Sequence, residues 1–175
     1  MFFHAFGNVA IDLVSHCNNN NIILDFSNNT MYNNTFSYSG ITRLGTLDMS
    51  KVPSNSSYHT SNMLLGSVEL HTIEKIISHS GIQWSAQAFG NTSKLANITF
   101  EGEIGRSIYL QYSPLTVDSM KSVINHLVNY SGTDEELVYT VSFSSACWEA
   151  LEASGTAPNG DTWHNYVALN LGWNV

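Results

Sequence analysis

The sequence predicts a repeat solenoid of the α/β class, a leucine-rich-repeat-like stack of short parallel strands closed by a C-terminal α/β cap. An apolar motif, Leu-x-x-Leu/Ile, recurs at Leu44, Leu70 and Leu95, in steps of 26 and 25 residues. Two copies of Ala-Phe-Gly-Asn, at 5–8 and 88–91, bracket these repeats. Periods of about 20 to 50 residues are typical of solenoids, because each repeat buries its apolar face only by stacking on its neighbours.

The repeats are expected to occupy residues 1–105, with one short strand and one irregular return in each. Alternating apolar and polar residues around Leu47, Ile73 and Ile98 indicate strands, and the Asn- and Ser-rich stretches 54–61 and 78–80 indicate loops. Aligning the repeats predicts two buried columns of side chains. One contains Leu24, Leu47, Ile73 and Ile98, and the other contains Leu44, Leu70 and Leu95.

Residues 106–175 do not repeat and are expected to form the cap. From about 115 to 129, apolar residues follow the spacing of an amphipathic helix, with Thr116 as the N-cap. The sequence then predicts a strand at 137–143, a short helix at 147–153 and a final strand at 166–175.

No matching cap is indicated at the N-terminal end. Phe2, Phe3 and Phe6 precede the first repeats, and an apolar strand edge at this end would invite association with another chain. We therefore expect either an oligomer formed through the N-terminal edge or a chain that is the C-terminal piece of a longer protein.

The composition indicates a folded domain with an uncharged polar surface. Of 175 residues, 43% are hydrophobic, whereas only 11% are charged, less than half the usual share of about 25%. The net charge is −8, and the six Lys and Arg residues are scattered, so no basic patch is expected to bind nucleic acid. We find neither a signal peptide nor an apolar run long enough to span a membrane. Cys17 and Cys147 are expected to be buried free thiols, because they lie near opposite ends of the stack.

Aligning the repeats also places Asp25, Asp48 and Glu74 at one outward position, with Thr99 next in the column. Carboxylates about 4.8 Å apart on stacked strands repel one another unless they spread into solvent, bind a cation or pair with Lys75. Solvent exposure is the favoured interpretation, and these three acidic residues are weak candidates for a metal site. The histidine spacing does not support zinc, and no cofactor motif is present.

Two arrangements of residues are candidate catalytic sites. Glu101 and Glu103 could act as the carboxylate pair of a glycoside hydrolase, but an exposed strand edge with an ion pair to Arg106 is the favoured interpretation. Ser144, Ser145 and Cys147 near His164 lack a nucleophile elbow and an orienting acid. No catalytic residue is therefore assigned.

Aromatic side chains are concentrated in the second half of the chain, where they can stack on sugar rings or anchor a protein interface. Trp148, Trp163 and Trp173 are expected to close the end of the stack. Trp84 is expected to be partly exposed in a loop, so that its replacement by alanine would weaken binding with little change in melting temperature. The candidate binding residues are Trp84, Asp48, Glu74, Thr99, Tyr109 and Tyr112.

The stretch Ala88–Leu95, followed by Ile98 and Phe100, resembles the BspA-type leucine-rich repeats of bacterial surface proteins. The segment Leu47–Val52 is similar to a variant of that repeat, although the repeat cysteine is absent here. The stretch 114–129, together with the terminal Gly-Trp-Asn, resembles the C-terminal end of such repeats in tail-associated proteins of phages and prophages of gut bacteria.

This resemblance implies adhesion or recognition on a phage tail or bacterial cell surface, and no shared catalytic residue. The partner would be a host cell-surface glycan or protein, or another chain of the same particle. A non-enzymatic recognition, adhesion or structural module is therefore the expected function. A polysaccharide hydrolase or lyase on a β-solenoid, and a purely architectural spacer, are the alternatives.

Overall fold

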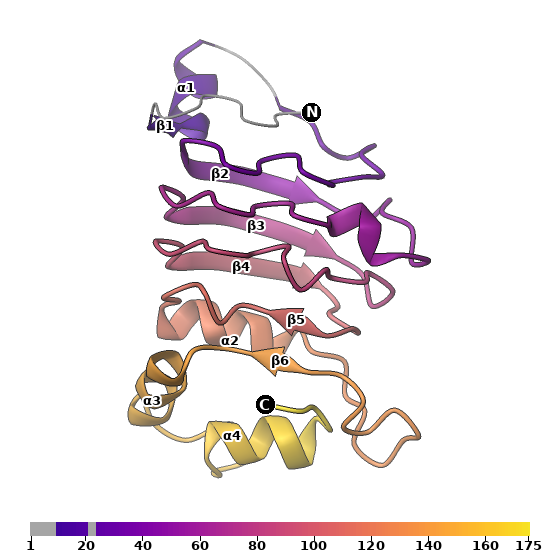
Figure 1. The fold of residues 1–175 in the computed structure, drawn as a ribbon. Helices are drawn as coiled ribbons and strands as arrows, with labels where there is room; N and C mark the ends of the chain where they lie inside the picture. Colours follow the sequence, from indigo (N-terminus) through magenta and orange to yellow (C-terminus); the bar gives the residue numbers. More distant parts are fainter. Residues whose placement is uncertain (1–9, 21–23) are drawn as a thin grey trace.

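The computed structural model describes residues 10–20 and 24–175, which form a mixed α/β fold with the elements arranged in tiers (Figure 1). Its main sheet has four strands in the order β1-β2-β3-β4, and every neighbouring pair is parallel. A second, two-stranded parallel sheet follows toward the C-terminus. The strands of the main sheet are β1 (Ile11–Asp12), β2 (Ile41–Asp48), β3 (Thr72–Ser78) and β4 (Asn97–Gly102), and those of the second are β5 (Ile108–Tyr109) and β6 (Val141–Ser142).

The register of the main sheet differs from the sequence alignment by three residues at the first step. Leu44 lies opposite Ile73, which lies opposite Ile98, so the step from β2 to β3 is 29 residues and the next step is 25. A second buried column contains Leu47, Ile76 and Phe100. The strands and the burial of these residues are confirmed, as is the burial of Leu70 and Leu95.

The membership of the predicted columns is wrong. Leu47 and Ile73 are not partners, and Leu24 is 36% exposed. The sequence alignment failed because the loop between β2 and β3 is longer than the loop between β3 and β4. That loop contains a turn of 3-10 helix, η1 (Ser57–Thr60).

The return segments behind the sheet are joined by their own main-chain hydrogen bonds. Amide groups at alternate residues from Tyr32 to Tyr38 donate to carbonyls between His59 and Leu65, at 2.7–3.0 Å. The amides of Leu64 and Gly66 donate in the same way to Ala88 and Gly90. Gly66 has a φ of +71°, and a Cβ there would lie 2.5 Å from the ring of Tyr38, so only glycine fits.

A buried hydroxyl group follows each of these return segments. Ser39, Ser67, Thr92 and Ser113 are at most 4% exposed, and they occur once in each successive turn of the chain. The hydroxyls of Ser39 and Ser67 lie 3.3 Å apart, and those of Thr92 and Ser113 lie 2.7 Å apart. These contacts satisfy polar groups that would otherwise be costly to bury.

Helix α2 (Val117–Asn125) closes the outer edge of β4, in the place that a fifth strand would take. The amides of Ile98 and Phe100 each donate to a serine hydroxyl of α2, Ser119 or Ser122, at 2.9 Å. The amide of Thr116 donates to the carbonyl of Ala96 at 2.8 Å, and Thr116 is the N-cap that the sequence predicts. The helix is shorter than the predicted range of about 115–129, because Leu127 instead pairs with Ile104.

The segment after α2 contains less strand than the sequence predicts. Only Val141–Ser142 of the expected strand 137–143 forms β6. Of the expected final strand 166–175, the first five residues form a π-helix, η2 (Tyr166–Asn170), which continues a short α-helix, α4 (Trp163–Asn165), and Asn174 forms an isolated bridge with Thr140. The start of α4 is fixed by Glu152, whose carboxylate accepts from the amides of Trp163 and His164 at 3.0 and 2.7 Å. Glu152 lies on α3 (Ser145–Ala153). The presence of α3 confirms the short helix predicted at 147–153.

The end of the stack is closed partly by tryptophan, as expected. Trp173 and Trp163 are buried, and Trp148 is half-buried. The indole Nε1 of Trp173 donates to the carbonyl of Val128 at 2.7 Å. Cys17 and Cys147 are buried free cysteines, as predicted.

The N-terminal end carries two elements that the sequence did not indicate. Strand β1 pairs with β2, and helix α1 (Leu13–Asn19) packs beside it, with Asp12 as its N-cap. Strand β1 is the edge strand of the main sheet, and residues 1–9 lie outside the described structure, so the expected unpaired edge of the first strand stays a prediction. Phe2, Phe3 and Phe6 lie outside the described residues.

The buried column predicts the effect of Ile73→Ala. Ile73 is 1% exposed between Leu44 and Ile98, so the substitution should leave a cavity and lower the free energy of unfolding by about 2–5 kcal/mol, measured by urea denaturation. Ile77→Ala is the matched control, because Ile77 lies on the same strand but is only half-buried. An equal loss from both variants would contradict the observed register.

The edge contacts of α2 predict the effect of Ser119→Ala. The substitution leaves the amide of Ile98 buried without its acceptor, which should lower the free energy of unfolding by about 1–3 kcal/mol. The exposed Ser93 provides the control substitution Ser93→Ala, for which we expect a change within about 0.5 kcal/mol. Equal stability of the two variants would show that α2 does not close this edge.

Candidate functional site

Ion pairs join charged side chains from successive turns of the chain. Arg43 on β2 lies between Asp12 and Glu74, at 3.7 Å from the first and in hydrogen-bond contact with the second. Lys75 pairs with Glu101 at 2.7 Å. Lys94 pairs with Glu69 at the same distance, and its hydrogen bond lowers the pKa of Glu69. Because these groups are all partly exposed, each pair contributes little to stability.

The predicted acidic column is not formed. Asp48 lies opposite Ile77, and the register places Gly45 level with Glu74. Asp25 is in a loop, where hydrogen bonds from Ser27 lower its pKa. Among the described residues there is no group of three or more Asp, Glu, His or Cys side chains able to hold a metal ion. The weak metal candidates Asp25, Asp48 and Glu74 therefore lie apart.

Glu74 and Thr99 do share a polar depression of about 250 Å³ between the sheet and the start of α2. Asp118 on α2 adds a second carboxylate, and there is no aromatic side chain in the lining. The depression is lined by Thr72, Ile73, Glu74, Asn97, Ile98, Thr99, Thr116, Asp118 and Ser119.

A second open depression, of about 350 Å³, brings together segments that are far apart in the sequence. We call it the aromatic depression. Ser57 comes from η1, two residues come from the loop after β3, and the others come from β5, the loop before it and the segment before β6. Its lining residues are Ser57, Gln83, Trp84, Arg106, Ser107, Tyr109 and Tyr139.

Trp84 is buried beneath this depression and is not the exposed loop residue that the sequence predicts. It is 5% exposed, and its ring packs against Phe89 and Phe100 at centroid distances of 5.6 and 6.0 Å. The loop that carries Trp84 is polar in sequence, but the indole packs against Phe100, which belongs to the second buried column. The indole Nε1 is buried without a hydrogen-bond partner.

Arg106 is held in a fixed position at the edge of the aromatic depression. Its guanidinium lies 4.7 Å from the ring centroid of Tyr139, a cation–π contact, and donates to the carbonyl of Gly105 at 3.0 Å. A longer contact of 3.4 Å joins it to the hydroxyl of Tyr130. Burial raises the pKa of Tyr130, and this effect outweighs the positive charge of Arg106, which lowers it. The hydroxyl therefore stays protonated at neutral pH.

The two candidate tyrosines have different positions. Tyr109 is partly exposed on β5 and lines the aromatic depression. Tyr112 is 48% exposed and lies outside both depressions. Of the six residues that the sequence singles out for binding, Trp84 and Tyr109 therefore meet at one site and Glu74 and Thr99 at another.

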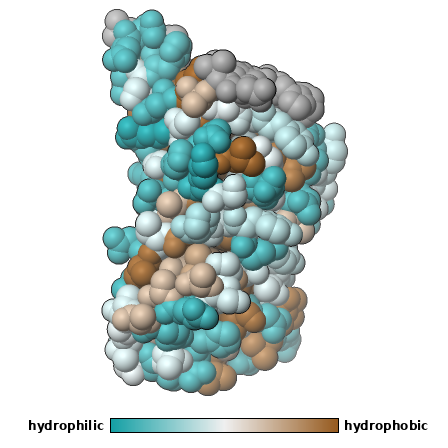
Figure 2. Space-filling model, turned by 60° about the vertical axis from the view of Figure 1, so that its left-hand side comes forward, coloured by the Kyte–Doolittle hydropathy of each residue, from teal (hydrophilic) through white to brown (hydrophobic). Residues whose placement is uncertain are grey.

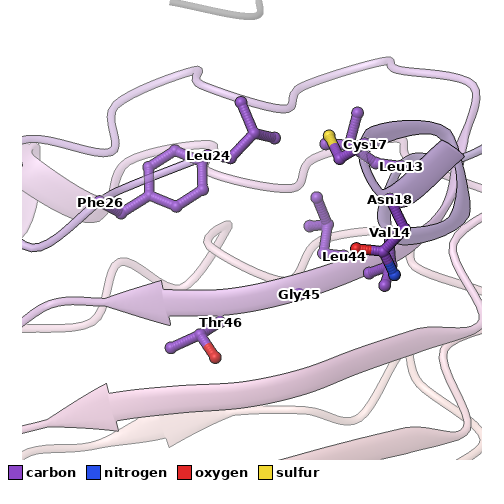
Figure 3. Close-up of a pocket in the computed structure, with 9 residues that line it drawn as sticks. All are labelled: Leu13, Val14, Cys17, Asn18, Leu24, Phe26, Leu44, Gly45 and Thr46. Carbon is purple, nitrogen blue, oxygen red and sulfur yellow. The ribbon is translucent and has the colours of Figure 1, made fainter. Parts of the chain in front are cut away.

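An apolar pocket of about 250 Å³ lies at the N-terminal end, above β2 (Figure 3). Side chains of α1 line one side of it, and Leu24 and Phe26 line the other. Its lining residues are Leu13, Val14, Cys17, Asn18, Leu24, Phe26, Leu44, Gly45 and Thr46.

The residues weighed for catalysis have structural contacts. Glu101 is paired with Lys75, and Arg106 approaches Glu135 at 3.8 Å instead of forming the expected pair beside Glu103. Ser144 caps α3 by accepting from the amide of Cys147 at 3.2 Å. His164 packs against Trp148 at a centroid distance of 5.2 Å.

Figure 2 shows one face of the molecule, on which hydrophobic residues appear as separate spots among hydrophilic and intermediate ones. Within the described ranges, no helix combines the length and apolar character needed to cross a membrane. No family model, curated protein or solved structure matches the chain.

The burial of Trp84 reverses the expected effect of its replacement on stability. Trp84→Ala should remove a packed ring and lower the free energy of unfolding by about 3–5 kcal/mol, seen as a lower melting temperature. Tyr112→Ala, at an exposed aromatic residue, is the control and should leave the melting temperature almost unchanged. A melting temperature unaffected by Trp84→Ala would show that the indole is not part of the core.

Proposed function

We propose that this chain is a leucine-rich-repeat-like solenoid over residues 1–105, capped by residues 106–175, and that it works as a non-enzymatic recognition or adhesion module. The parallel strands, the hydrogen-bonded return segments and the buried hydroxyl in each turn support the solenoid. The position of α2 along the edge of β4, where a further strand would otherwise pair, supports the cap.

The observation that carries the functional proposal is the aromatic depression. It combines a partly exposed ring, Tyr109, with hydroxyl, amide and guanidinium groups in one open surface feature. Sugar rings stack on aromatic faces while their hydroxyls bind polar groups, so a cell-surface glycan is the partner that fits this lining best. The site is assembled where the repeats meet the cap, and neither part forms it alone.

A phage tail or a bacterial cell surface is the proposed location. The resemblance to BspA-type repeats supports it, together with a surface built from Asn, Ser and Thr in place of charged residues. Another chain of the same particle is a further possible partner, and the apolar pocket above β2 is the described feature that supports association at the N-terminal end.

The rival functions have less support in the described residues. A glycoside hydrolase needs two carboxylates facing one another across a groove. Glu101 is engaged by Lys75, and Glu74, which shares a depression with Asp118, is engaged by Arg43. An architectural spacer does not need a depression in which four segments distant in sequence converge.

Binding of the purified protein to a glycan array and to whole bacterial cells tests the proposal. Tyr109→Ala should weaken binding about tenfold or more, because an aromatic face that a sugar stacks on is lost. Tyr112→Ala is the matched control and should bind like the wild type, since Tyr112 lies outside the depression. Absence of glycan and cell binding by the wild-type protein would overturn the proposal.

A further inference from the structure

Arg106, like Lys121, contacts an aromatic ring, and it differs from three other cationic side chains that have described partners. Arg43, Lys75 and Lys94 each hydrogen-bond to a carboxylate, and Lys121 lies over Trp163. The nearest carboxylate to Arg106, that of Glu135, is 3.8 Å away, which is too far for a hydrogen bond. Arg106 is also the one charged residue that lines the aromatic depression.

The contacts of Arg106 leave most of its donors unused. Both of its hydrogen bonds, to Gly105 and Tyr130, come from Nη1. A guanidinium has five N–H donors in a planar fork, so within the described structure Nε and Nη2 keep theirs. The cation–π contact with Tyr139 and the two hydrogen bonds from Nη1 hold the group in place, and the side chain is 34% exposed. The group is therefore both preorganised and accessible.

The neutral groups around Arg106 suit the hydroxyls of a sugar. Gln83 donates from Nε2 to the carbonyl of Ser54 at 2.7 Å, which fixes its amide and leaves Oε1 as an acceptor. Ser57 and Ser107 add hydroxyl groups to the lining, and Tyr109 adds an aromatic face. A ligand that uses all of these groups has a ring, several hydroxyls and one negative charge.

We propose that the aromatic depression binds an acidic saccharide, a sugar that carries a carboxylate such as a uronic or sialic acid, and that Arg106 binds the carboxylate. This inference rests on the proposed function. A planar carboxylate matches the fork of a guanidinium and accepts two parallel hydrogen bonds, which makes Arg the appropriate residue at this position. The protein has a net charge of −8, which repels an acidic ligand, so such a ligand needs a local cation in order to bind.

The test measures the dissociation constants of three probes: an oligosaccharide with a carboxylated sugar, the same compound as its methyl ester, and its neutral counterpart. We expect the wild-type protein to bind the carboxylated probe at least about tenfold more tightly than the other two, because charge-assisted bidentate hydrogen bonds are lost in both. This comparison requires no variant and so does not depend on the folding of a mutant.

Arg106→Gln should remove this preference, and Arg106→Lys should retain part of it, since lysine keeps the charge but not the planar fork. Lys51→Gln is the matched control, because it makes the same change of charge at an exposed residue outside the depression. Melting curves of all three variants would show whether each is folded, which matters because Arg106 packs on Tyr139.

Equal affinity of the wild type for the carboxylated and esterified probes would overturn this inference and leave the proposed function standing. If Arg106→Gln kept the preference for the carboxylated probe, this inference would also be overturned and the proposed function would stand. Absence of binding to any saccharide would overturn both. Equally tight, Arg106-dependent binding of an acidic peptide would show that the ligand class is wrong.

Discussion

Main-chain hydrogen bonds between successive turns of the chain are the interactions on which the rest of the structure depends. One set joins the parallel strands β2, β3 and β4, and another joins the return segments behind them. Because the strands pair in register, side chains that are 24 to 29 residues apart come to lie in columns. The apolar columns form the core, the hydroxyl groups of Ser39, Ser67, Thr92 and Ser113 satisfy buried polar groups, and the charged side chains pair across turns.

A stack of this kind has two ends, and the unpaired strand edge at each must be covered. At one end α2 supplies serine hydroxyls to the amides of β4, so that a helix takes the place of a further strand. At the other end β1 and α1 lie against β2. The segments that flank α2 in the sequence bring Arg106, Tyr109 and Tyr139 beside η1 and the loop after β3. The candidate site is thus a consequence of how the stack ends.

The aromatic depression shows how the same side-chain types can serve the core or the surface. Trp84 belongs to the core, because its ring lies over Phe89 and Phe100. Arg106 packs on Tyr139 and makes its internal hydrogen bonds through Nη1, which leaves the donors of Nε and Nη2 for a ligand. The chemistry that the site offers a ligand therefore comes mainly from Arg106 and Tyr109, with the buried indole as a structural floor.

The sequence by itself determined the elements that depend on local pattern: the strands β2 to β4, the amphipathic helix α2 with its Thr116 cap, the helix α3 and the two buried free cysteines. Tertiary structure decided the register between β2 and β3, because loop length there is constrained by hydrogen bonds between residues 29 apart and not by periodicity. It also decided the burial of Trp84 and the helical form of 163–170, whose start is fixed by a carboxylate on another helix. Arg106 was seen in the sequence only as an ion-pair partner, since its position over Tyr139 arises from contact between segments 33 residues apart. Local sequence patterns specify how a segment can fold, whereas hydrogen bonds and packing between distant segments decide which side chains meet.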